Sequence, residues 1–199
     1  MFINMNALTG FKDCAWHFRA RIGRLRALAS APQGGICAEI GVWKGDFSRR
    51  ILQFCHPQEL HLVDPWQFAP QFPDRWYGGA LARNQADMDA IFESVEKRFH
   101  QNQVVSIHRA CSTQAVDIFR DHYFDWIYID GDHSFECVLS DLNLWNSKVK
   151  PNGVIALDDY NWRDESHQPS VKLAIEAFLA DHKVKAAKCA QGQYLIRVF

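Results

Sequence analysis

Short apolar runs alternate along the chain with longer segments in which apolar residues recur every three or four positions. The short runs are typical of buried strands, and the longer segments are typical of helices that cover a sheet. The pattern predicts five strands, at residues 36–42, 60–63, 104–108, 124–129 and 154–157. It predicts six helices, at residues 12–30, 46–55, 87–100, 113–120, 134–148 and 169–181.

Strands separated by helices favour a parallel sheet, because parallel neighbours need a crossover connection that a helix provides. The early strands are continuous apolar runs, which is typical of a sheet covered on both faces. Residues 150–153 predict a turn before the fifth strand, and residues 185–189 and 194–198 predict a closing hairpin around Gln191-Gly192. We therefore predict an α/β fold with a doubly wound, mostly parallel seven-stranded sheet and a C-terminal antiparallel hairpin.

Composition and charge narrow the class of protein. The chain has 199 residues, 48% of them hydrophobic, which is enough to build a core and excludes intrinsic disorder as the main state. The net charge of −1 excludes the strong positive field of a non-specific nucleic-acid binder. Arg19, Arg21, Arg24 and Arg26 fall in one early stretch. We interpret it as a solvated helix face or a subunit contact, which makes a homodimer possible, rather than as a phosphate or lipid site.

Cysteine usage and hydropathy bear on the compartment. The six cysteines form no C-x-x-C pair, which favours scattered reduced thiols over a disulfide framework or a zinc site. No run approaches 18 apolar residues, and residues 1–10 lack a basic segment followed by an apolar one. We therefore predict a cytoplasmic protein that neither crosses nor binds a membrane.

The first two strands end in residues that suit a nucleoside with an amino-acid tail. The first strand leads into the pattern E-x-G-x-x-x-G, formed by Glu39, Gly41 and Gly45. The glycines allow a tight turn close to a ligand, and the carboxylate would attract an ammonium group and repel the pyrophosphate of NAD. Asp64 ends the second strand about 20 residues later, where an acid can bind ribose hydroxyls. A plain turn starting at Asp64-Pro65 is the alternative.

The fourth and fifth strands end in carboxylates. Asp130 follows the fourth strand, and Asp158 and Asp159 follow the fifth. Such acids repel one another unless a cation lies among them, and hard oxygen ligands indicate Mg²⁺, Mn²⁺ or Ca²⁺. His133 lies three residues after Asp130 and could act as a general base. The alternatives are that Asp132 caps the next helix and that His133 is an ordinary helix-start residue.

These motifs together resemble a known enzyme family. The E-x-G-x-x-x-G pattern, the acid that ends the second strand, and the segments DWIYIDGDHSFECVLSDL and KVKPNGVIALDDY are similar to class I S-adenosylmethionine-dependent methyltransferases. Within that family, the resemblance is closest to the metal-dependent O-methyltransferases of the macrocin and macrolide-sugar type. It covers about residues 34–162 and implies a Rossmann-like domain at 34–199, preceded by a helical segment at 1–33.

The resemblance also implies roles for individual residues. Glu39, Gly41 and Gly45 would hold the methionine part of S-adenosylmethionine, and Asp64 would bind its ribose. Ser112 would lie near the adenine, although a plain helix cap is the simpler interpretation of this serine. The metal ligands would be Asp130, Asp158 and Asp159, with Asp130 also next to the cofactor. His133 would be the catalytic base, acting together with Asp130.

The implied activity is divalent-metal-dependent O-methylation of a small polar acceptor, such as a sugar, a glycan or a natural-product diol. One alternative is a protein that binds S-adenosylmethionine or a nucleotide without methyl transfer. Another is a cephalosporin-hydroxylase-like enzyme, although the sequence lacks the 2-His-1-carboxylate set of iron oxygenases. The aromatic segment 66–77 and Trp162 are expected either to cover the acceptor or to belong to the core. Arg75 and Arg163 are interpreted as surface residues rather than as contacts to an anionic acceptor.

Overall fold

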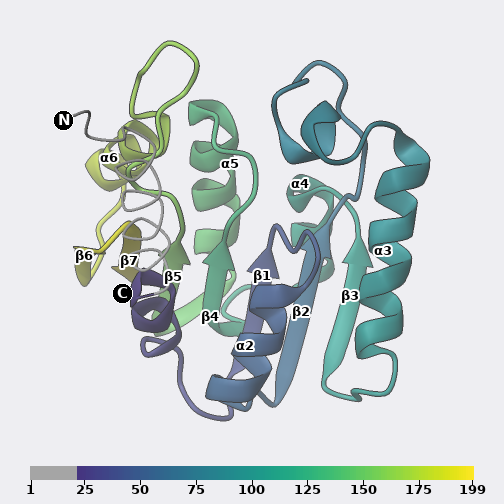
Figure 1. Ribbon diagram of the computed structural model, residues 1–199. Coiled ribbons are helices and arrows are strands. Elements are labelled where there is room, and N and C mark those ends of the chain that lie inside the picture. The colour runs from purple at the N-terminus through teal and green to yellow at the C-terminus, as the bar shows by residue number, and fades with distance from the viewer. Residues whose placement is uncertain (1–21) are drawn as a thin grey trace, which may run out of the picture.

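A computed structural model describes residues 22–199 of the chain. Its seven strands form one sheet in the order β3-β2-β1-β4-β5-β7-β6 (Figure 1). The strands are β1 (Ile36–Ile40), β2 (Glu59–Asp64), β3 (Val105–Arg109), β4 (Phe124–Ile129), β5 (Val149–Leu157), β6 (Ala186–Ala190) and β7 (Gln193–Arg197). The first five strands pair in parallel, and β7 is antiparallel to β5 and β6. The predicted fold class is confirmed.

Helices cover both faces of this sheet. They are α2 (Asp46–Cys55), α3 (Gln85–Phe99), α4 (Ser112–Ala115), α5 (Phe135–Asn146) and α6 (Ser170–Asp181), with the short turns η1 (Trp76–Ala80) and η2 (Val116–Ile118). Residues 22–28 are also helical. The core under α2 and α3 is distinct from the core under α4, α5 and α6, so each face of the sheet has its own packed layer.

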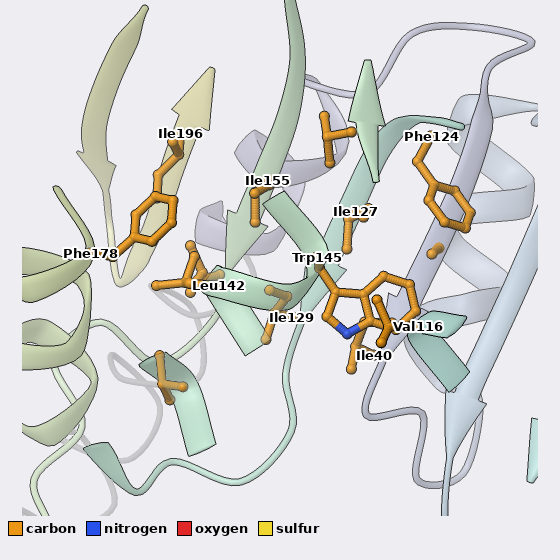
Figure 2. Close-up of a cluster of buried hydrophobic side chains, with 14 of the residues drawn as sticks. Ile40, Val116, Phe124, Ile127, Ile129, Leu142, Trp145, Ile155, Phe178 and Ile196 are labelled. Carbon is orange, nitrogen blue, oxygen red and sulfur yellow. The ribbon is translucent and has the colours of Figure 1, made fainter. Parts of the chain in front are cut away.

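The layer under α5 and α6 shows how the sequence builds the core. Figure 2 shows Trp145 of α5 beside Phe124, while Phe178 of α6 lies near Ile196. These aromatic side chains have no exposed surface, and each such burial stabilises the fold by about 1.5–3 kcal/mol. The two layers explain why the strands are continuous apolar runs rather than alternating ones.

Local signals set several element boundaries. The side chains of Asn84 and Ser134 accept hydrogen bonds from backbone N–H groups in the first turns of α3 and α5. Ser134 is therefore the cap of α5, and the alternative that Asp132 caps this helix is wrong. Gln191 and Gly192 both have positive φ, which is the backbone that a two-residue hairpin turn requires.

Three predicted elements differ from the structure. Of the helix predicted at 12–30, only residues 22–28 are described as helical, and residues 12–21 lie outside the described part of the chain. The helix predicted at 113–120 is two short turns, α4 and η2. The turn predicted at 150–153 is a bulge inside β5, because Phe124 pairs with Val149 while Trp126 pairs with Val154.

The register of the parallel strands creates one site. Ile40 pairs with Ile129, and Ile129 pairs with Leu157. The next residues, Gly41, Asp130 and Asp158, therefore meet at the same edge of the sheet. Figure 1 shows this edge at the top, with the segments after β2 and β5 looping above it. In open α/β sheets, ligands bind at this edge.

The structure also bears on the predictions about membrane spans and cysteines. Within residues 22–199, no helix is long and apolar enough to cross a membrane. The described cysteines are free, and Cys37 and Cys55 are buried, in keeping with reduced thiols. The domain boundary at residues 33 and 34, the homodimer and the cytoplasmic location stay predictions.

Candidate active site at the carboxyl ends of the strands

The loop between β1 and α2 requires glycine at two positions. Gly41 has a φ of 89°, and a Cβ there would lie 2.1 Å from the carbonyl oxygen of Asp130. Gly45 has a φ of 72°, and a Cβ there would lie 2.8 Å from the ring of Phe99. Trp43, between them, also has a positive φ of 53°. Such conformations favour glycine, so the sequence pattern marks a loop pressed closely against its neighbours.

Glu39 supports this loop from within the core. Only 1% of its surface is exposed, and its carboxylate accepts a hydrogen bond from the hydroxyl of Ser48 in α2. Burial raises the pKa of Glu39 well above its usual value, and the Ser48 hydrogen bond offsets part of that rise. The predicted ligand-binding carboxylate is therefore a buried group that ties β1 to α2.

Asp64 holds the other side of the loop. Its Oδ2 accepts hydrogen bonds from the backbone N–H groups of Val42 and Trp43, both at 2.9 Å. Its Oδ1 accepts one from the backbone N–H of Trp66 at 2.7 Å. Burial raises the pKa of Asp64, and these three hydrogen bonds act in the opposite direction. Each carboxylate oxygen can accept two hydrogen bonds, so Oδ1 keeps one acceptor position.

Three side chains after β4 and β5 form a compact cluster. Asp130, His133 and Asp159 each place one ligand atom so that all three atoms lie within 4.8 Å of one another. His133 Nε2 is 3.6 Å from Asp130 Oδ1 and 3.5 Å from Asp159 Oδ2, which is too long for direct hydrogen bonds. Nε2 is buried and has no hydrogen-bond partner among the described residues. The cluster thus encloses a position where its three polar atoms converge.

Asp158 points away from that position. Its Oδ1 accepts hydrogen bonds from the Asp159 backbone N–H at 2.8 Å and from the amide of Gln193. Its Oδ2 accepts hydrogen bonds from the Tyr128 hydroxyl at 2.8 Å and from Arg24 Nε at 2.7 Å. The structure therefore brings Asp130 and Asp159 together with His133, whereas the oxygens of Asp158 are occupied by protein groups.

Arg24 is the residue that the sequence interpretation missed. Its Nη2 lies 2.6 Å from Asp158 Oδ2 and 3.2 Å from Asp130 Oδ2. Its neighbour Arg26 is exposed, as expected of a solvated helix face. Arg19 and Arg21 lie outside the described residues. Arginines at every second or third position gave no signal that one of them would turn toward acids more than 100 residues away.

The shared site couples the charges of these groups. Burial, and next the charge of Asp158, raise the pKa of Asp130 to about 7, and the same two causes raise the pKa of Asp159. Burial acts to raise the pKa of Asp158, but Arg24 and the hydrogen bonds outweigh it, so this pKa is lowered. For His133, burial acts to lower the pKa, but the neighbouring carboxylates outweigh it and the pKa is raised. The raised pKa values of Asp130 and Asp159 thus indicate that the positive charge in the site does not balance its carboxylates.

Comparison with known proteins decides the family. A family model described as a methyltransferase domain matches residues 38–160, which include the glycine loop and both acidic strand ends. The chain belongs to this family. It is an S-adenosylmethionine-dependent methyltransferase domain, and the cofactor is implied by that membership.

Individual proteins are also similar to this chain. An uncharacterised protein of Acanthamoeba polyphaga mimivirus is 32% identical over 146 residues, which are 72% of this chain and 58% of that protein. The structure is similar to the O-methyltransferase NovP, with a TM-score of 0.60 and 15% identity over 92% of this chain and 79% of that one. The N-methyltransferase NodS of Bradyrhizobium japonicum has a TM-score of 0.54 and 13% identity, covering 94% and 95% of the two chains. At these identities, the two structures show the fold alone.

The glycine loop and Asp64 have features that suit the cofactor of the methyltransferase domain. Glycine at positions 41 and 45 lets the loop pack against the Asp130 backbone and the Phe99 ring, which holds the loop at the edge of the sheet where ligands bind in such folds. Asp64, beside it, keeps an acceptor position. We call the glycine loop together with Asp64 the cradle, and its free acceptor position suits a ribose hydroxyl of S-adenosylmethionine.

Ser112 has a different local role from the predicted helix cap. It is the first residue of α4, and Cys111 holds the cap position without a side-chain hydrogen bond. The Ser112 hydroxyl donates a hydrogen bond to Asp141 of α5, a buried carboxyl whose pKa burial raises to about 6. Asp141 Oδ2 is 3.7 Å from where a Cβ on Gly131 would lie. The pair thus borders the turn after β4, and its place near the adenine stays a prediction.

Three consecutive residues of the segment after β2 reach three different strand ends. The Arg75 guanidinium lies 4.8 Å from the centre of the Trp162 ring, after β5. The Trp76 ring lies 6.0 Å from the Trp43 ring, after β1. The Tyr77 hydroxyl donates a hydrogen bond to Asp132, after β4, at 2.7 Å. This stretch therefore spans the site, and Arg75, interpreted as a surface residue, is half-buried and packs on Trp162.

The aromatic segment is divided between the core and the edge of the site, and its covering of an acceptor stays a prediction. Trp66 is fully buried in the core, whereas Trp76 is 59% exposed beside the glycine loop. Trp162 packs on the His133 ring at 4.9 Å, and its Nε1 is buried without a hydrogen-bond partner among residues 22–199. Trp145 Nε1, in the core, is the third buried side-chain nitrogen of this kind in the described chain. Arg163 is exposed and bonds to the carbonyl oxygen of His167.

Proposed function

We propose that the domain transfers the methyl group of S-adenosylmethionine to a hydroxyl of a small polar acceptor, assisted by a divalent cation. The observation that carries this proposal is that carboxylate oxygens of Asp130 and Asp159 converge with His133 Nε2, a buried nitrogen without a hydrogen-bond partner in the described chain. The cluster adjoins the glycine loop of the methyltransferase domain, since the Asp130 carbonyl contacts Gly41. A methyl donor and an activated oxygen could therefore meet at this edge.

The charge balance supports a divalent cation. Asp130, Asp158 and Asp159 carry three negative charges when ionised, and Arg24 supplies one positive charge. With His133 neutral, as a general base must be, two negative charges remain on groups that are largely buried, and burying unpaired charge is costly. The donor set of two carboxylates suits Mg²⁺, Mn²⁺ or Ca²⁺. Asp130 and Asp159 would hold the ion, and Asp158 would position Arg24 instead of ligating.

A bound cation would lower the pKa of an acceptor hydroxyl and so make the oxygen a better nucleophile. His133 would accept the hydroxyl proton at Nε2, the nitrogen that faces both carboxylates. Methyl transfer would form the oxygen–methyl bond and break the sulfur–methyl bond, whose electron pair would stay on sulfur in S-adenosylhomocysteine. Trp162 packs against the His133 ring at a tilted angle and would hold this ring in place. Fixing both reactants in line supplies much of the rate acceleration.

The surroundings of the cluster support a small acceptor. Trp162, Trp76 and Tyr77 place aromatic rings around the site, and residues 75–77 reach across it. A small molecule with two neighbouring oxygens, such as a sugar or a catechol-like diol, fits the cation and the aromatic surfaces. The oxygenase alternative gains no support, because the described cluster has one histidine and two carboxylates.

The test is transfer of radiolabelled methyl from S-adenosylmethionine to two probe acceptors, catechol and a methyl glycoside with free vicinal hydroxyls. We expect product with Mg²⁺ and its loss in excess EDTA, while S-adenosylhomocysteine still binds by calorimetry. His133→Gln should lower kcat and leave cation binding intact. Full activity in excess EDTA would overturn the cation's role, and unchanged kcat in His133→Gln would overturn the role of the base.

A further inference from the structure

Arg24 reaches the cofactor edge of the sheet from outside the part of the chain that matches the family model, residues 38–160. We propose that Arg24 and Asp130 together bind the amino-acid head of S-adenosylmethionine. Arg24 takes the α-carboxylate, and Asp130 takes the α-ammonium group. The inference rests on the cofactor of the family. It shares Asp130 with the proposed cation site, but its test measures ligand binding alone and requires neither the cation nor the acceptor.

The position of Arg24 places it beside the glycine loop. Its Nη2 is 3.2 Å from Asp130 Oδ2, and the Asp130 carbonyl oxygen is the atom that a Cβ on Gly41 would meet at 2.1 Å. The guanidinium carbon also lies 5.8 Å from the centre of the Phe47 ring, in the first turn of α2. Arg24 thus faces the loop from the side of β4 and α2, next to the atoms that line the cradle.

Arg24 has hydrogen-bonding capacity to spare. A guanidinium has five N–H donors, and here Nε and Nη2 serve Asp158 and Asp130. No residue of the described chain accepts a hydrogen bond from Nη1, and 39% of the side chain is exposed. A carboxylate could therefore bind at Nη1 through charge-assisted hydrogen bonds.

The two charges match an α-amino acid. A positive and a negative group 3.2 Å apart are complementary to an ammonium and a carboxylate on one carbon atom. Asp130 can bind Arg24 and the ammonium group at the same time, because its two oxygens face different ways: Oδ2 faces Arg24 and Oδ1 faces His133. Asp158 holds Arg24 in place and is itself fixed by Tyr128 and Gln193, so the pair is pre-organised before the ligand arrives.

The test compares two ligands by calorimetry: S-adenosylhomocysteine, which has the amino-acid head, and 5′-deoxy-5′-methylthioadenosine, which lacks it. We expect Arg24→Gln to weaken S-adenosylhomocysteine by about 10- to 100-fold, as for loss of charge-assisted hydrogen bonds, and to leave methylthioadenosine unchanged. Arg24→Lys should recover part of the loss. The matched control is Arg26→Gln, an exposed arginine on the same helix, which should bind both ligands as the wild type does.

Equal losses for both ligands in Arg24→Gln, or no loss for either, would overturn the proposal. A second measurement needs no variant and so does not depend on how Arg24→Gln folds. The wild-type protein should bind decarboxylated S-adenosylhomocysteine, which keeps the amine and lacks the carboxylate, at least about 10-fold more weakly than S-adenosylhomocysteine. Equal affinity for these two ligands would contradict a carboxylate contact.

Discussion

Two clusters of titratable side chains lie on different strands of the same sheet. The acidic cluster, formed by Asp130, His133 and Asp159, follows the carboxyl ends of β4 and β5. The histidine network, formed by Glu59, His61, His108 and Tyr123, includes Glu59 at the start of β2 and Tyr123 just before β4. The two contain the same kinds of groups and differ in how completely those groups are paired.

The histidine network is satisfied within the protein. His61 Nδ1 lies 3.0 Å from His108 Nε2, and His61 Nε2 lies 3.1 Å from a Glu59 carboxylate oxygen. The Tyr123 hydroxyl donates a hydrogen bond to the same carboxylate. A hollow of about 360 Å³ opens beside it, lined in part by both histidines and Phe119. The polar groups beside this hollow are hydrogen-bonded to one another, so the volume of a hollow does not by itself identify a functional site.

The acidic cluster is unsatisfied by the same criteria. His133 Nε2 has no partner in the described chain, and the carboxylates outnumber the neighbouring cations. Paired polar groups in a core stabilise one structure, whereas unpaired buried groups cost stability and persist where a ligand completes them. The contrast teaches that pairing, more than the presence of histidines and acids, separates a functional site from a structural network.

The largest expected effect is on catalysis. Asp159→Asn removes one oxygen ligand with little change in size and should lower methyl transfer at least about 100-fold, because cation stabilisation of developing charge amounts to several kcal/mol. Glu59→Gln, the matched change in the histidine network, should leave kcat within about twofold. Steady-state kinetics with saturating S-adenosylmethionine and Mg²⁺ measures both. A large kcat loss in Glu59→Gln would remove the distinction between the clusters.

The next effect is on stability, where the variant in the histidine network should have the larger effect. His61→Ala removes a buried ring and leaves Glu59 and His108 unpaired, so it should lower the free energy of unfolding by about 2–4 kcal/mol. Asp159→Asn should leave it unchanged or raise it, because a carboxylate near Asp158 is lost. Urea unfolding without added metal measures both free energies. The contrast fails if Asp159→Asn proves the more destabilising change.

A smaller effect concerns pH. The pKa of Asp130 is raised to about 7 and the pKa of Asp141 to about 6. Both lie above the values of the unfolded chain, so the folded state binds these protons more tightly. Their stabilising contribution is complete below about pH 4 and is lost as the pH rises toward 7. Asp130→Asn should therefore raise the Tm at pH 8 by about 2–4 °C without metal. The exposed Asp121→Asn is the control and should not raise it. A lower Tm for Asp130→Asn at pH 8 would contradict the pKa direction.

The sequence predicts the fold more completely than the site. Apolar runs and helical periodicity give the layers, because each face of the sheet must be buried. The acids at the strand ends are also predictable, since Asp130 and Asp158 directly follow buried strands whose register brings them together. Their individual orientations are not predictable. Asp158 and Asp159 are adjacent in sequence, yet one binds Arg24 and the other faces His133.

The missed residues share a physical cause. Arg24 and Arg75 act through long-range contacts from segments without a motif, so composition and spacing describe them as surface charges. Asp141 follows the helical pattern of α5, and only its burial and its hydrogen bond from Ser112 distinguish it. Such roles depend on the tertiary fold rather than on local pattern.

The most direct test of the proposed cation site is a calorimetric titration of the metal-free protein with Mn²⁺. We predict one site per chain in the wild type, loss of that site in Asp159→Asn, and unchanged binding in the histidine-network variant His61→Asn. Mn²⁺ binding that survives Asp159→Asn, or that disappears in His61→Asn, would contradict the assignment of the cation to the acidic cluster.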